Sequence, residues 1–347
     1  MKGINKTLSE ELKERFSGNR KIERFLKLDP DNYEERQNLA LEVSSDILYV
    51  HSKEDLPYIA ISLAKLERNL TDIQPYQRDH VCHSLLTFLL GYYMILKLDL
   101  QRSLFDFLFQ WKLTALLHDI GYSLEIIDRI SNEFFRMYEE DILQRKYDFN
   151  SSQTRLLTKY LNLYTIEGRQ KRNTLDLINN RLRRWQIPLD VKDVFTRMLG
   201  SRKFDDKLRR TDHGVVSSIL VMKAIDEKYR IMNPDQISDP NDPWSFSNMT
   251  EQITNVCSAI FIHNLEANSL VWNFTENPLA TLLKISDALQ CWGRPSAKEP
   301  KGDSPEDYDV SFQDGKFAFY AKKDRVKSLK TKIENTIHFP IVIEDLL

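Results

Sequence analysis

An apolar helical stretch that ends in two adjacent polar residues is the strongest constraint on how this chain folds. Residues 105–117 are mostly apolar, and His118 and Asp119 follow them directly, with Gly121 as a natural place for the helix to stop. Imidazole is a neutral nitrogen ligand and carboxylate an anionic oxygen ligand, so the pair suits a first-row divalent cation better than zinc-thiolate chemistry. The pattern therefore predicts a buried helix that delivers two ligands to a metal site.

Three more histidines and one more aspartate lie in comparable helical surroundings. His83 lies in an apolar helical pattern with His80 three residues before it, on the same helix face. His213 follows the expected start of another helix, His263 ends a third, and Asp287 lies inside the last apolar one. A carboxylate buried there would be costly unless it were paired or bound to a metal.

The order of these residues resembles a known family. His83, the His118 and Asp119 pair, His213, His263 and Asp287 are similar to the ligand set of HD-domain metal-dependent phosphohydrolases, in the variant with two histidines between the HD pair and the final Asp. The resemblance covers about residues 76–297. The interval between Asp119 and His213 is longer than the family pattern, which implies an inserted subdomain.

The resemblance implies a ligand set for divalent ions, two in number, with Asp119 bridging them. The implied metal ligands are His83, His118, Asp119, His213, His263 and Asp287. Nitrogen and oxygen donors without thiolate fit manganese, iron, cobalt, nickel or magnesium. Asp119, His213 and His263 are the implied catalytic residues. If only one ion binds, the two histidines would instead contact the phosphate or protonate the leaving group.

Three further side chains near these motifs are candidates for binding the substrate. Arg78 and Arg294 carry guanidinium groups, which pair bidentately with phosphate, and each has a structural salt bridge as the alternative. His80 is a candidate phosphate donor, with a role behind the metal ligands or a place in the core as alternatives.

The second half of the inserted segment is strongly basic. One prediction is a lid or groove that attracts a polyanionic substrate, and the alternative is a solvated helical face whose counter-charges lie elsewhere. The basic residues are Arg169, Lys171, Arg172, Arg181, Arg183, Arg184, Lys192, Arg197, Arg202, Lys203, Lys207, Arg209 and Arg210.

Composition favours a mainly α protein, since the 347 residues include only 10 glycines and 12 prolines and are rich in helix-forming types. The expected architecture is an HD-domain helical core with a helical insertion and a small α/β C-terminal appendage. In the appendage, alternating apolar residues around Gln313-Asp314-Gly315 predict a β-hairpin. The predicted parts are a helical arm (1–75), the core (76–130 and 205–297), the basic insertion (131–204) and the hairpin-and-helix appendage (298–347).

The sequence also predicts where the protein works. The most apolar run, residues 85–96, is shorter than the roughly 20 residues that span a bilayer, so no membrane association is expected. The 3 cysteines have no CxxC spacing and the first residues lack a signal peptide's apolar core, which favours a reduced, cytoplasmic setting. Whether the protein forms oligomers stays open.

The expected function is hydrolysis of a phosphoester or phosphoanhydride, most simply in a nucleotide, by a metal-activated water. Two alternatives remain: an HD-type nuclease on single-stranded nucleic acid, suggested by the basic insertion, and a non-catalytic nucleotide-sensing HD module. The intact ligand set argues against the sensor. A nuclease would bind less tightly as salt rises, much more steeply than a mononucleotide hydrolase.

Overall fold

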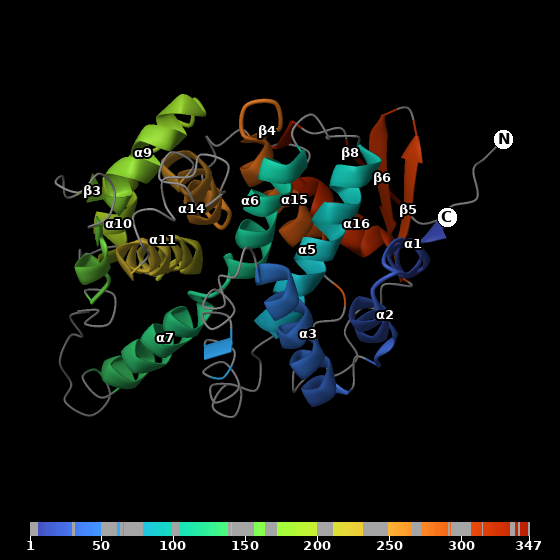
Figure 1. The fold of residues 1–347 in the computed structure, drawn as a ribbon, viewed down its shortest axis with the longest axis horizontal. Coiled ribbons are helices and arrows are strands. Elements are labelled where there is room, and N and C mark those ends of the chain that lie inside the picture. Colours follow the sequence, from blue (N-terminus) through green and yellow to red (C-terminus); the bar gives the residue numbers. More distant parts are fainter. Residues whose placement is uncertain are drawn as a thin grey trace. The chain divides into compact units, whose positions relative to one another are not determined.

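In the computed structural model, most of the described residues are α-helical, which confirms the predicted mainly α fold (Figure 1). It describes residues 6–29, 32–49, 61–62, 65, 79–98, 104–137, 140, 156–163, 172–199, 211–231, 249–265, 272–290, 292, 307–313, 315–333, 337–338 and 341–345. The chain forms two compact units, Met1–Leu116 with Val271–Leu347, and Leu117–Leu270. The predicted boundaries of arm, core, insertion and appendage divide the chain differently and stay predictions.

Helix α5 (His80–Lys97) lies at the centre of the first unit and packs against α1, α3 and α15. Almost every side chain of α5 is buried, as its apolar sequence predicts. Trp111 of α6 lies against Gly91 and donates from its ring nitrogen to the Phe88 carbonyl at 3.1 Å. The other helices of this unit are α1 (Leu8–Arg15), α2 (Arg20–Lys27), α3 (Tyr33–Leu48), α6 (Leu104–Leu117), α15 (Pro278–Leu289) and α16 (Lys323–Ile333).

A four-stranded sheet in the order β1-β5-β6-β8 completes the first unit. Strands β5 (Asp309–Gln313) and β6 (Lys316–Ala321) form the predicted antiparallel hairpin, with Gly315 at a φ of 72° (Figure 1). Strand β8 (Ile341–Asp345) runs parallel to β6. Strand β1 (Lys6–Thr7) pairs with β5, so the N-terminal segment belongs to the same sheet as the hairpin. A second pair, β4 (Trp272–Asn273) and β7 (Ile337–His338), is parallel.

In the second unit, α11 packs against α7 and α14, and α9 packs against α10 and α14. Apolar residues of α11 and α14, such as Val216, Ile219, Val256 and Ile260, are fully buried. The elements are α7 (Tyr122–Met137), the 3-10 helix η3 (Leu157–Tyr160), β2 (Asn162–Leu163), β3 (Arg172–Asn173), α9 (Thr174–Arg184), α10 (Val191–Leu199), α11 (His213–Ile231), the π-helix η5 (Met249–Ile253) and α14 (Thr254–Ile262). Strands β2 and β3 pair antiparallel.

Short side chains fix where the histidine-bearing helices begin. The Asp79 carboxylate accepts from the backbone N–H groups of Val81 and Cys82, at 2.8 and 3.0 Å, and so starts α5 at His80. Asp212 accepts from the N–H of Val215 at 3.0 Å at the start of α11. Caps of this kind contribute about 1 kcal/mol each to helix stability. They also set which helical turn carries each histidine.

None of the helices that the structure describes is long and apolar enough to cross a membrane. Cys82 and Cys257 are buried and form no disulfide in the described part of the chain, and Cys291 lies outside the described residues. Burial raises the pKa of the Cys257 thiol well above its usual range.

Candidate metal centre

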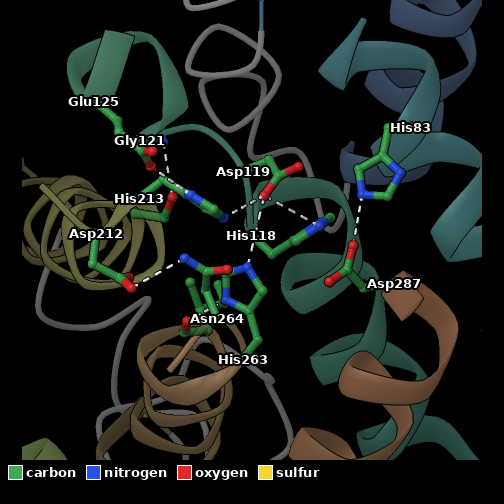
Figure 2. A network of polar contacts seen from close by, with 12 residues as sticks. His83, His118, Asp119, Gly121, Glu125, Asp212, His213, His263, Asn264 and Asp287 are labelled. Carbon is green, nitrogen blue, oxygen red and sulfur yellow. Dashed lines mark hydrogen bonds and ion pairs between the residues drawn. The ribbon is translucent and has the colours of Figure 1, made fainter. Parts of the chain in front are cut away.

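Three histidines surround one carboxylate in the second unit (Figure 2). Oδ1 of Asp119 lies 3.4 Å from Nε2 of His118, 3.3 Å from Nε2 of His213 and 3.7 Å from Nε2 of His263. His118, Asp119 and His263 are buried, and the His213 side chain is 13% exposed. Four of the predicted site residues, which span more than 140 positions in the sequence, are thus brought together.

The distances in this cluster suit a shared cation better than direct hydrogen bonds. Hydrogen bonds from N–H to oxygen are usually about 2.7–3.2 Å long. Atoms that bind one first-row cation, each at about 2.1 Å, lie roughly 3.0–3.4 Å from one another. One donor atom from each of His118, Asp119 and His263 lies within 4.8 Å of the others, close enough to hold one metal ion.

The outer nitrogens of two of these rings are held by oxygen acceptors. Nδ1 of His213 lies 2.7 Å from Oε2 of Glu125, and Nδ1 of His263 lies 2.6 Å from the carbonyl oxygen of Ile260. A carboxylate and a carbonyl only accept, so each ring donates from Nδ1, and the neutral ring keeps its lone pair on Nε2. That lone pair, on the side of Asp119, is what a metal ligand requires.

The electrostatics of His213 favour a positive charge at the cluster. Burial by itself disfavours the protonated ring, but the hydrogen bond with Glu125 and the charges of Asp119, Glu125 and Asp212 outweigh it. Together they raise the pKa of His213 from 6.5 to about 9. The same carboxylates that raise the pKa of His213 would attract a cation to the cluster.

Two glycines allow the helix ends to meet at the cluster. The N–H of Gly121 donates to the Ser217 hydroxyl at 2.8 Å, and a Cβ on Gly121 would lie 2.6 Å from the His213 carbonyl oxygen. A Cβ on Gly214 would lie 2.8 Å from the His263 ring. Helix α6 ends at Leu117, before Gly121, and Gly121 does not have a positive φ. Gly121 is therefore needed for this close approach rather than as the helix stop.

The remaining two predicted ligands form a pair in the first unit. Nε2 of His83 lies 2.9 Å from Oδ1 of Asp287, and Nδ1 of the same ring hydrogen-bonds the side-chain oxygen of Gln290. The amide nitrogen of Gln290 donates to the carbonyl of Trp292 at 2.5 Å, which fixes which end of the amide faces His83. His83 is buried, whereas the Asp287 side chain is 30% exposed. A common centre for this pair and the Asp119 cluster stays a prediction from the resemblance.

Of the predicted substrate-binding residues, the structure describes one. His80 is buried in the first turn of α5, with its ring centroid 6.4 Å from that of His83. Arg78 and Arg294 lie outside the described residues. Their phosphate-binding roles stay predictions.

Sequence reasoning missed three residues that support the histidines. Glu125 contacts His213, and Gly214 lies against the ring of His263. The local sequence predicts neither contact, because the fold creates both. Gln290 could have been predicted from the sequence, because it follows Asp287 by three residues and so lies on the same side of a helix.

Part of the predicted positive field on the insertion is neutralised. Lys192 pairs with Asp176 at 2.7 Å, Arg197 with Asp193 at 2.5 Å, and Arg181 with Glu251 at 3.6 Å. Arg183 and Arg184 of α9 are exposed. The basic residues that lie outside the described part of the chain are Arg169, Lys171, Arg202, Lys203, Lys207, Arg209 and Arg210. The described helices thus favour a solvated face with its own counter-charges.

Comparison with known proteins adds no family assignment. No family model, curated protein or solved structure matched this chain. The order of the predicted ligand residues and the geometry of the Asp119 cluster are therefore the features that point to a function.

Proposed function

We propose that this protein is a metal-dependent phosphohydrolase of the HD type, which cleaves a phosphoester or phosphoanhydride bond of a nucleotide with a metal-activated water. The observation that supports it most is the convergence of three imidazole Nε2 atoms on Oδ1 of Asp119, at 3.3–3.7 Å. Buried nitrogen and oxygen donors at these separations fit a divalent ion such as manganese, iron, cobalt, nickel or magnesium.

Each residue of the cluster has a role in the proposed reaction. A divalent ion held there would lower the pKa of a water and stabilise charge on the attacking and leaving oxygens of the phosphoryl group. Asp119 would supply negative charge that holds the ion, and His118 and His263 would bind the ion from buried positions. His213, the most exposed of the three rings, is the one best able to contact the phosphate or protonate the leaving group.

The proposal includes two metal ions and the full set of six ligands. His83 and Asp287 join it because the resemblance assigns them, together with His118 and Asp119, to one of the ions. The nuclease alternative is weaker, because three basic residues of the described insertion helices pair with acids. A nucleotide sensor would share the cluster and lack turnover.

Metal content and hydrolysis, measured on the same protein samples, test the proposal. We expect about two transition-metal ions per chain in the wild type, and turnover of a small nucleotide with added manganese. Asp119→Asn keeps the shape of the side chain and removes its charge, so we expect loss of both metal and turnover. Asp226→Asn is the control, because Asp226 is equally buried in α11 and pairs with Lys223 at 2.8 Å. A wild type that neither retains nor regains metal and cleaves nothing would overturn the proposal.

A further inference from the structure

Glu125 stands out among the residues that contact the histidines. It lies in the first turn of α7, and its carboxylate oxygen is 2.7 Å from Nδ1 of His213, 88 residues later in the chain (Figure 2). The Glu125 side chain is 21% exposed. The contact fixes the ring so that Nε2 lies 3.3 Å from the Asp119 oxygen.

His263 provides the internal comparison, because its Nδ1 is held by the neutral carbonyl of Ile260 rather than by an anion. A hydrogen bond to a carboxylate is roughly twice as strong as one between neutral groups. It also raises the basicity of the imidazole nitrogen on the other side of the ring. His213 is therefore the stronger donor of the two, and Glu125 is the reason.

We propose that Glu125 is a positioning residue of the metal centre, which acts through His213 and sets how tightly the ion beside His213 is held. The inference builds on the proposed function, since it concerns the same centre. It adds to that centre a carboxylate that is no ligand itself.

Asp128, on the same helix, serves as the control for a purely structural role of Glu125. Asp128 lies one turn further along α7, is 2% exposed, and accepts a hydrogen bond from the Thr211 hydroxyl at 2.6 Å. Through this hydrogen bond it anchors the start of α11. If Glu125 only anchored the helix, neutralising either carboxylate would have the same consequence.

Calorimetric titration of the metal-stripped, full-length protein with Mn²⁺ separates the two roles. Glu125→Gln keeps an oxygen acceptor and removes the charge, and we expect it to weaken Mn²⁺ binding about 10–100-fold. Asp128→Asn should lower the Tm and leave Mn²⁺ affinity within about threefold, because the hydrogen bond that it weakens is the one with Thr211. Equal affinities in Glu125→Gln and the wild type, or equal losses in both variants, would overturn the inference.

A double-mutant cycle tests whether Glu125 acts through His213. In a His213→Ala background, Glu125→Gln should produce no further loss of Mn²⁺ affinity, since the ring it orients is gone. Additive losses would mean that Glu125 acts by another route. A wild type that binds no Mn²⁺ would overturn the proposed function and this inference together, whereas normal wild-type binding with an unaffected Glu125→Gln overturns the inference alone.

Discussion

The Asp119 cluster and the His83–Asp287 pair use the same residue types in different arrangements. In both, a buried histidine has its Nδ1 held by an oxygen acceptor. In the pair, one imidazole meets one carboxylate at 2.9 Å, and that carboxylate is 30% exposed. In the cluster, three imidazoles surround one carboxylate oxygen at 3.3–3.7 Å, and the Asp119 side chain is 7% exposed.

The difference indicates which region is the better candidate to hold a cation. In the pair, Nε2 of His83 lies at hydrogen-bonding distance, 2.9 Å, from Oδ1 of Asp287, and water reaches the carboxylate. In the cluster, three ring nitrogens lie 3.3–3.7 Å from one buried carboxylate oxygen, which is longer than the usual N–H to oxygen hydrogen bond. The case for a metal therefore comes from the cluster, and the role of the pair has to be measured.

Among the variants that test this comparison, Asp287→Asn has the largest expected effect. If the pair contributes to the first ion, as the resemblance implies, metal content after dialysis should fall from about two ions per chain to about one. Asp309→Asn, on strand β5 of the same unit, should leave it unchanged. Elemental analysis measures both. A full complement of metal in Asp287→Asn would make the pair a structural hydrogen bond and confine the site to the Asp119 cluster.

The sequence predicted the parts of the molecule that local patterns encode. The periodicity of apolar residues predicted α5, α6 and the β5–β6 hairpin. The order of polar residues pointed to His118, Asp119, His213 and His263, which the structure brings together. It did not identify Glu125 or Gly214, whose roles arise from contacts with His213 and His263 that only the fold creates.

Strand β1 was missed for a different reason. Its two residues, Lys6 and Thr7, are too few to show the alternation by which a strand is recognised. Only its hydrogen-bonded partner β5, about 300 residues later, makes it a strand.

A smaller effect is expected from adding one methyl group in each unit. Gly214→Ala would place a Cβ 2.8 Å from the His263 ring, and Gly91→Ala would place one 2.0 Å from the Trp111 ring. Overpacking of this kind destabilises a protein by about 1–3 kcal/mol, so both variants should lower the Tm. We expect only Gly214→Ala to weaken Mn²⁺ binding as well, by about tenfold, since it displaces a ligand. Equal losses of metal in the two variants would remove the distinction between the units.

The smallest effect is expected on the basic face of α9. Arg183 and Arg184 are exposed, so changing both to alanine should alter kcat/KM for a mononucleotide by less than about twofold. The same double variant tests the nuclease alternative by fluorescence anisotropy with a single-stranded oligonucleotide. If the protein is a nuclease that uses both arginines, the logarithm of its binding constant should fall less steeply with the logarithm of salt concentration in the double variant than in the wild type, by about 1.4 in slope.

The two units differ in how the chain supplies them. The second is one continuous stretch, Leu117–Leu270, while the first is split around it and includes strands from both ends of the sequence. Domains fold as units while the ribosome makes the chain from its N-terminus. A nascent chain that has reached Leu270 already contains every residue of the Asp119 cluster. Strand β1 can pair only after β5 has been made, and His83 can meet Asp287 only after Asp287 has been made. During synthesis, all residues of the Asp119 cluster are thus present before the His83–Asp287 pair can form.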